Sequence, residues 1–287
     1  MKQTFIFIFI SIILFSCKKE ATDASWLKID KWVLTANPNA QNNTGELSHD
    51  LSQVFVNMDG KSLGVFELPA KIPIIGDGDH EFVILPGIIN NGISETKKRY
   101  PFMEPYNGTI NLIKNDTVSL NLPTQYYNSI KFLIEDFESP SMQLEVSTES
   151  TATIGRNDNP SILQWGNKYG EVLLTDSAAS ISFVTTFETV LPKLATEVYL
   201  EFDYMNSNSL LTSVLSYGNG NYYSDPYILL TSQDPNKAFW KHAYIDLKEI
   251  ISFRQTTPIN EAGFQIVLDE GETSTYFYID NIKLVYP

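Results

Sequence analysis

The sequence predicts an all-β protein made of two β-sandwich domains. Short runs that alternate apolar and polar residues recur along the chain, with Gly, Pro, Asn and Asp between them, as in strands joined by turns. Only residues 248–251 favour a helix. A length of 287 residues is enough for two domains of ordinary size.

The composition excludes several classes of function. The chain carries 20 Lys and Arg against 34 Asp and Glu, for a net charge of −14. Such a charge repels the phosphate backbone of nucleic acids, so the sequence predicts no nucleic-acid partner. Its single cysteine excludes an internal disulfide and a zinc site made of thiolates.

The N-terminus has the pattern of an export signal. After Met1 and Lys2, residues 5–15 form an apolar run that is too short to span a bilayer. The run ends in Leu14-Phe15-Ser16-Cys17, which resembles the lipobox of bacterial lipoproteins. The alternatives are an ordinary signal peptide that contains a cysteine, or a buried amphiphilic helix.

The lipobox resemblance implies that lipid is attached to Cys17 after cleavage before it. Residues 1–16 are then the signal peptide and 17–25 a polar tether. The charged residues that start at Lys18 resemble those of exported lipoproteins of the Bacteroidetes. This implies a lipid anchor in the outer membrane, with the protein on the cell surface or on the periplasmic face.

A domain boundary is predicted near residues 122–129, where proline and polar residues separate two strand patterns. It divides the mature chain into an N-terminal β domain, 26–128, and a C-terminal domain, 129–287. Most of the negative charge lies in the second domain.

Three turn pairs predict three hairpins in the first domain. They are Asp59-Gly60, Asp77-Gly78 and Asn115-Asp116, each between two strand patterns. The order of "MDGKSLG" and "GDGDHEFVI" resembles small Ig-like or surface-layer repeat modules, which implies an Ig-like or small β-sandwich domain. Residues 86–108 are predicted to form a long loop.

The second domain shows nine strand patterns, which predict an antiparallel sandwich. They cover residues 132–137, 169–174, 181–187, 198–204, 210–217, 227–231, 243–247, 264–268 and 276–285. In the fourth pattern Glu201 and Asp203 alternate with apolar residues, which predicts a strand with one face in water.

Four motifs of this domain resemble the galactose-binding-like jelly roll of carbohydrate-binding modules. They are the opening "EDFE" at 135–138, the central "VYLEFDY" at 198–204, "YIDL" at 244–247 and the closing "IDNIKL" at 279–284. The resemblance covers residues 131–287. It implies a jelly-roll β-sandwich that binds a glycan or a partner protein.

The same resemblance implies a structural calcium ion held by the first and last strands. The matching positions are Asp136 or Glu138 and Asp280, whose carboxylates are the hard oxygen ligands that Ca²⁺ prefers. The alternative is that Asp280 caps a turn and Glu138 is a solvated edge residue.

Sugar sites in such modules present aromatic rings surrounded by polar side chains. The segment 217–227 is rich in Tyr, Asn and Gly and is predicted to be a loop, and a second candidate loop surrounds Trp165. The alternative is that these tyrosines pack on the rim of the sandwich. The candidate ligand-binding residues are Trp165, Tyr217, Asn221, Tyr222, Tyr223 and Asp225.

Motifs for catalysis are absent from the sequence. His49, His80 and His242 lie far apart in the chain, and there is no nucleophile elbow, P-loop or dinucleotide-binding motif. The predicted function is therefore a non-catalytic, membrane-anchored lipoprotein that binds a glycan or an envelope protein. The alternative is an assembly accessory without a small ligand, which docks through the loop 86–108, and a glycan hydrolase is a minor possibility.

Overall fold

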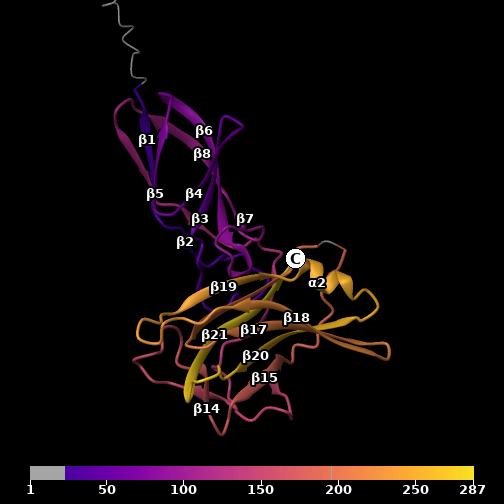
Figure 1. Cartoon of the computed structure of the whole chain (residues 1–287). Helices are drawn as coiled ribbons and strands as arrows, with labels where there is room; N and C mark the ends of the chain where they lie inside the picture. Colours follow the sequence, from indigo (N-terminus) through magenta and orange to yellow (C-terminus); the bar gives the residue numbers. More distant parts are fainter. Residues whose placement is uncertain (1–22, 195) are drawn as a thin grey trace, which may run out of the picture.

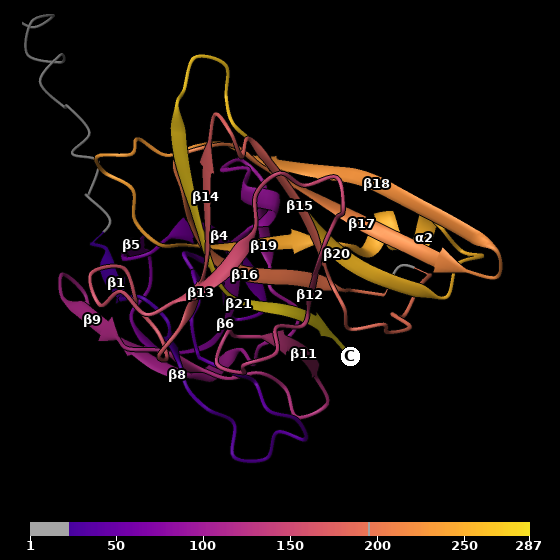
Figure 2. The ribbon, with the colours of Figure 1, turned by 90° about the horizontal axis from the view of Figure 1, so that it is seen from below.

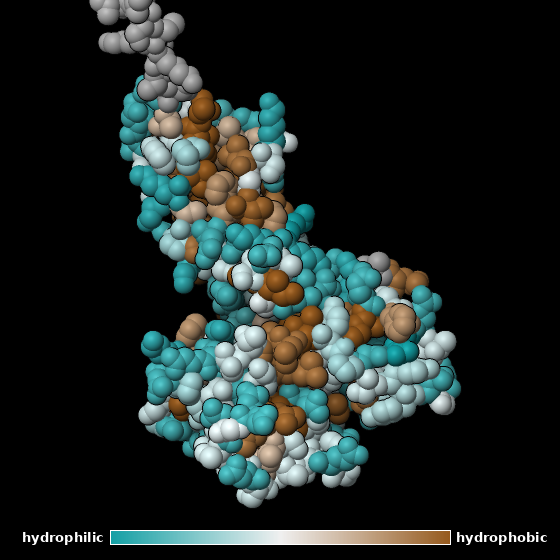
Figure 3. Space-filling view, in the orientation of Figure 1, coloured by the Kyte–Doolittle hydropathy of each residue, from teal (hydrophilic) through white to brown (hydrophobic). Residues whose placement is uncertain are grey.

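The computed structural model describes residues 23–194 and 196–287, and it is almost entirely β-structure. The described chain forms two lobes that meet at a narrower middle (Figure 1, Figure 3). Its helical segments are the 3-10 turn η1 (Asn90–Gly92) and the helix α2 (Lys248–Phe253). Neither segment, nor any other helix among these residues, has the length and apolarity needed to span a membrane.

The N-terminal lobe consists of three sheets whose strands all precede residue 125. The largest is five-stranded, with the order β4-β3-β6-β7 and with β8 also paired to β6. Its strands are β3 (Gln53–Met58), β4 (Lys61–Glu67), β6 (Gly78–Ile89), β7 (Lys97–Arg99) and β8 (Tyr106–Leu112). The smaller sheets contain β1 (Ser25–Ile29), β5 (Ala70–Ile74) and β9 (Thr117–Leu120), and β2 (Val33–Leu34) with β10 (Pro123–Thr124).

One of the three predicted hairpins is confirmed and two are wrong. Asp59 and Gly60 have φ of 50° and 74°, and they connect the paired strands β3 and β4. The strands on either side of Asp77-Gly78 do not pair with each other, because β5 pairs with β1 and β6 pairs with β3, β7 and β8. The strands on either side of Asn115-Asp116 do not pair with each other either, because β9 pairs in parallel with β1 and β8 pairs with β6. A turn signal reverses the chain, but it does not determine which strand becomes the hydrogen-bonded partner.

The predicted loop 86–108 is also wrong, because most of it is ordered against the second lobe. Strand β6 continues through Ile89 and is followed by η1 and β7. The Nζ atom of Lys98 lies 2.6 Å from Asp246 Oδ2 and 3.0 Å from Glu197 Oε2. The Oδ1 atom of Asn91 accepts a hydrogen bond from the backbone N–H of Asp246 at 2.8 Å.

The C-terminal lobe is a sandwich of two mainly antiparallel sheets. One has the order β13-β14-β21-β16-β19, with β11 also on β21, and the other has the order β12-β15-β20-β17-β18. The first contains β11 (Lys131–Glu135), β13 (Ile154–Asn157), β14 (Tyr169–Thr175), β16 (Tyr199–Asn206), β19 (Lys241–Asp246) and β21 (Ser274–Tyr286). The second contains β12 (Leu144–Val146), β15 (Ser180–Thr185), β17 (Leu210–Gly218), β18 (Asn221–Leu230) and β20 (Ile259–Val267).

All nine strands predicted for this lobe are present, and the all-β sandwich class is confirmed. The sequence missed β12 and β13, which have only three and four residues and therefore show no full alternation. The long hairpin of β17 and β18 reaches outward from the sandwich beside α2 (Figure 2).

The inner faces of the two sheets form the main hydrophobic core. Phe183 and Phe264 stack with ring centroids 5.1 Å apart, and Phe202 meets Phe264 edge to face at 5.3 Å. All three rings are buried, so each removes a large apolar area from water.

The second hydrophobic core extends across the junction between the lobes. It contains the buried residues of the N-terminal lobe together with Tyr199, Tyr244 and Val285 of the sandwich. The prediction that Glu201 and Asp203 face water is wrong, since both are fully buried. The N-terminal lobe covers the face of β16 that carries them, which no local pattern could reveal.

Candidate functional site

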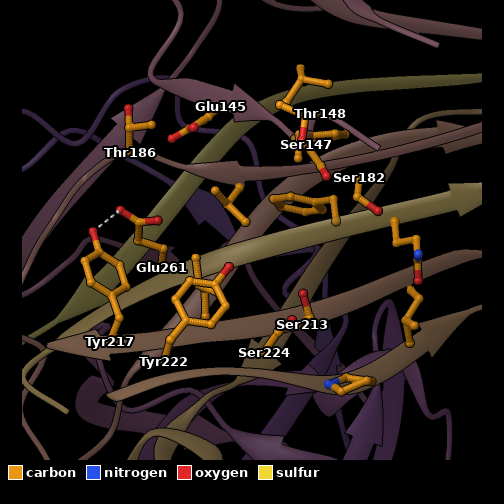
Figure 4. Close-up of a pocket in the computed structure, with 18 of the residues that line it drawn as sticks. Glu145, Ser147, Thr148, Ser182, Thr186, Ser213, Tyr217, Tyr222, Ser224 and Glu261 are labelled. Atoms are coloured by element: carbon orange, nitrogen blue, oxygen red, sulfur yellow. Dashed lines mark hydrogen bonds between the residues drawn. The ribbon is translucent and has the colours of Figure 1, made fainter. Parts of the chain in front are cut away.

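A groove crosses the outer face of the five-stranded sheet of the C-terminal sandwich (Figure 4). It has a volume of about 510 Å³ and is lined by residues of β12, β15, β17, β18 and β20. A volume of this size lies in the range of small-molecule sites in proteins. The outer face of this sheet is therefore a candidate ligand site.

The alternation of side chains along a strand explains which residues of β17 face the groove. In β17, Leu211, Ser213 and Tyr217 line the groove, whereas Leu210 and Val214 are buried in the core. A strand places successive side chains on opposite faces, so every second residue of β17 reaches the groove. Hydroxyl groups are frequent among them, from Ser147, Thr148, Ser182, Thr186, Ser213 and Ser224.

Two tyrosines mark one end of the groove. Tyr217 and Tyr222 are directly opposite each other in the pairing of β17 with β18, and both line the groove. Asn219 and Gly220 form the turn between these strands, with φ of 52° and 78°. The segment predicted to be a loop is therefore a hairpin, and its period of two residues decides which tyrosines point to the groove.

The hydroxyl of Tyr217 donates a hydrogen bond to Glu261 Oε1 at 3.1 Å (Figure 4). The side chain of Glu261 is at the inner edge of the groove, and the residue is only 5% exposed. Burial raises the pKa of Glu261, the Tyr217 hydrogen bond opposes this, and the charges of Glu188 and Glu145 raise it further. Burial, together with the charge of Glu261, raises the pKa of Tyr217 to about 12, so Tyr217 remains a donor at neutral pH.

A glycine keeps the floor of the groove open. Gly263 lies opposite Ser213 on one neighbouring strand and Val184 on the other, and these two residues line the groove. A Cβ at Gly263 would lie 2.2 Å from Ser213 Oγ and 3.5 Å from Val184 Cγ1. Any side chain at this position would take up space above the floor.

The structure places only two of the six predicted ligand-binding residues in this groove, Tyr217 and Tyr222. Tyr223 and Asp225 point to the other side of β18. The guanidinium of Arg254 lies 4.0 Å from the Tyr223 ring, and it holds Asp225 through two hydrogen bonds of 2.8 and 2.6 Å. Asn221 lies at the tip of the hairpin and donates to the Asn219 carbonyl at 3.3 Å.

Trp165 lies at a different place, in a crevice between the two lobes. Its ring meets Trp240 edge to face at 5.6 Å, and Trp240 Nε1 donates to the Ile162 carbonyl at 2.7 Å. The crevice has a volume of about 200 Å³, and its lining includes His49 and His242, which are distant in sequence. A role of Trp165 in binding stays a prediction.

The sequence did not predict that polar residues on or next to β12, β15 and β20 would line the groove. Glu145, Glu261 and Gln265 all line the groove, together with Glu188 after β15. The signal was present in β20, where Glu261, Gly263 and Gln265 follow one another with the period of a strand. Only the order of strands in the sheet brings these elements side by side.

The three predicted calcium ligands line one polar cavity of about 260 Å³. Asp136, Glu138 and Asp280 contribute to it together with Glu46 and Asn281. The oxygen atoms of this lining suit a hard cation. Within the described residues, however, no group of three or more His, Cys, Asp or Glu side chains is close enough to hold a metal ion.

The electrostatics of this cavity favour a positive charge. Burial raises the pKa of Asp280 to about 8, and the charges of Asp136 and Glu138 contribute to the increase. The Oδ1 atom of Asn281 is buried and has no hydrogen-bond partner. Glu138 is already engaged, since Oε1 accepts from the N–H groups of Asn167 and Lys168 at 2.5 and 3.0 Å.

Comparison with known proteins finds solved structures with low TM-scores and low sequence identity. No family model matches the chain, and no curated protein matches it in sequence. A xylan-binding domain of carbohydrate-binding module family 22 has 14% identity over 54% of this chain and 93% of that chain, with a TM-score of 0.37.

Two further solved structures have the same TM-score of 0.37. One comes from a study of promiscuous specificity in carbohydrate-binding modules of the β-sandwich superfamily, with 13% identity over 81% of this chain and 84% of that chain. The other is the enzymatically active domain of tailspike protein 4 of bacteriophage CBA120, with 13% identity over 52% of this chain and 20% of that chain.

Proposed function

We propose that this protein binds a glycan in the groove on the outer face of the five-stranded sheet. The observation that carries the proposal is the pair of tyrosines beside Glu261 at the end of a groove of about 510 Å³. The protein acts as a binding module without catalysis, held at a membrane by the lipid on Cys17.

The chemistry of the groove matches that of a sugar. A pyranose ring has an apolar C–H face, which packs on an aromatic ring, and a rim of hydroxyls that both donate and accept hydrogen bonds. Tyr222 offers a ring that is 69% exposed, and the Ser, Thr, Glu and Gln side chains of the groove offer partners for the hydroxyls. A largely pre-formed groove with a few placed polar groups is typical of ligand sites.

A glycan array with the full-length chain in detergent tests the proposal. We expect binding to at least one oligosaccharide class, and we expect the bound oligosaccharide to be recovered intact when its mass is measured after incubation. Absence of binding to every glycan would overturn the proposed function. Cleavage of a bound glycan would overturn its non-catalytic part.

We also propose that the groove is displayed away from the membrane. The described chain begins at Asp23, and β1 lies at the end of the N-terminal lobe opposite the C-terminal sandwich (Figure 1). Cys17 and the signal peptide lie outside the described residues. A Cys17→Ser variant should lose incorporation of labelled fatty acid and leave the membrane fraction, whereas retention of both would contradict the anchor.

For the cavity beside Asp280 we propose a structural Ca²⁺ ion, held by Asp280 together with Asp136 or Glu138. The oxygen-rich lining, the raised pKa of Asp280 and the unpartnered Asn281 Oδ1 support it. A bound cation would offset the repulsion among these carboxylates. The melting temperature should then fall when a chelator is added and recover with Ca²⁺, and an unchanged melting temperature in both conditions would remove the site.

A further inference from the structure

The charged side chains that line the groove within the described chain are all negative. Glu145 of β12, Glu188 after β15 and Glu261 of β20 line it, and all its other lining residues within the described chain are neutral. The charges of Glu145 and Glu188 raise the pKa of Glu261, as expected for carboxylates that line one groove.

The opposite side of the same hairpin is balanced in charge. There Arg254 donates two hydrogen bonds to the carboxylate of Asp225, and this interaction raises the pKa of Arg254. The guanidinium of Arg254 also lies over the ring of Tyr223. The three carboxylates that line the groove have no such cationic partner within the described lining.

Glu261 is the least exposed of these three carboxylates. It is 95% removed from solvent, and one of its oxygens accepts the Tyr217 hydroxyl. A partly desolvated carboxylate gains more from a cation than an exposed one, because water screens the interaction less. The adjacent rings of Tyr217 and Tyr222 add electron-rich faces, which also attract cations.

We propose that the groove selects glycans that carry free amino groups, with a sugar ammonium placed beside Glu261 and the ring on Tyr222. This inference rests on the proposed glycan-binding function and names the class of ligand. A free amino sugar supplies a cation and a C–H face on the same ring, which no neutral sugar does. Glycans that carry uronic acids or sulfate are repelled by the same three carboxylates.

Calorimetric titration of the full-length chain tests the inference with three ligands of equal length: a glucosamine oligomer, an N-acetylglucosamine oligomer and a cello-oligosaccharide. The glucosamine oligomer should bind at least about tenfold more tightly than the other two. Its advantage should shrink as salt is added, because added ions screen the attraction between ammonium and carboxylate.

Two variants with the same change in net charge locate the effect. Glu261→Gln should weaken binding of the glucosamine oligomer by about tenfold and leave the N-acetylated oligomer nearly unchanged. Glu272→Gln, in the exposed turn after β20, should leave both affinities as they are. Melting curves of both variants report whether the fold is kept, and Glu188→Gln repeats the test if Glu261→Gln unfolds.

The possible failures of the two proposals are distinguishable. Equal or tighter binding of the neutral oligomers would overturn the selectivity for amino groups and leave glycan binding intact. Binding of an oligolysine of matched length, with none of the three sugars, would overturn both proposals and assign the groove to basic peptides. An equal loss of affinity in Glu261→Gln and Glu272→Gln would show that the net charge of the protein, and not the carboxylate in the groove, attracts the amino sugar.

Discussion

The hydroxyl of Tyr126 donates a hydrogen bond to Glu201 Oε2 at 2.9 Å, and this contact joins the two lobes. Tyr100 donates to the other oxygen of the same carboxylate. Glu201 is fully buried, so each of its oxygens has a tyrosine hydroxyl of the N-terminal lobe as a donor in place of water. The junction therefore stabilises each lobe through the other.

Removal of the Tyr126 hydroxyl should destabilise the whole chain. Tyr126→Phe leaves a buried carboxylate oxygen without this donor, at a cost of about 1–3 kcal/mol in the free energy of unfolding. Because the core at the junction is shared, denaturation should remain a single transition for both lobes. Tyr222→Phe, which removes an exposed hydroxyl, is the matched control. Equal stability of the two variants would contradict the role of the contact.

His242 should make stability depend on pH on the alkaline side. Its Nδ1 lies 2.8 Å from Asp203 Oδ1, and its Nε2 lies 3.4 Å from Glu201 Oε2. Burial alone would lower the pKa of His242, but the charges of Asp203 and Glu201 outweigh it and raise the pKa from 6.5 to about 9.

The folded state therefore binds the proton of His242 more tightly than the unfolded state. Its contribution to stability is fully present below pH 6.5 and is lost as the pH rises through about 9. The difference in unfolding free energy between the wild type and His242→Gln should fall across this window, by at most about 3 kcal/mol. Urea denaturation at a series of pH values measures it. A difference that stays constant with pH would contradict the raised pKa of His242 in the folded state.

Adjacent tyrosines of β18 should behave in opposite ways. Tyr222→Ala removes an exposed ring from the groove, so it should abolish glycan binding and change the melting temperature little. Tyr223→Ala removes the ring that packs on Arg254, so it should lower the melting temperature and leave the affinity nearly unchanged. Binding that depends on Tyr223 and not on Tyr222 would place the ligand on the other side of the hairpin.

A methyl group on the floor of the groove should interfere with binding. In Gly263→Ala the new Cβ would approach Ser213 Oγ, and rotation of that hydroxyl gives room at a small cost in stability. The methyl group and the displaced hydroxyl should weaken glycan binding by about tenfold or more. Gly155→Ala is the control, because a Cβ there meets nothing within 4 Å. Unchanged affinity in Gly263→Ala would mean that the ligand does not reach the floor.

The sequence by itself determined where most strands of the sandwich lie and which of their side chains share a face. The alternation in β17 and β20, and the turn at Asn219-Gly220, follow from neighbours along the chain, whose preferences act locally. The same alternation places Tyr222 and Tyr223 on opposite sides of β18, and it could have predicted their opposite roles. The resemblance of residues 14–17 to a lipobox also comes from the sequence alone, and the lipid on Cys17 stays a prediction because that residue lies outside the described residues.

Only the tertiary structure decided which strands pair and what covers them. It pairs β5 with β1, and it buries Glu201 and Asp203 under the N-terminal lobe. It also collects Glu145, Glu188 and Glu261 around one groove, although no two of them are neighbours in sequence. These outcomes depend on contacts between residues far apart in the chain, where the packing of apolar surface must outweigh the entropy of closing long loops. A local sequence pattern therefore does not reveal which of these distant contacts form.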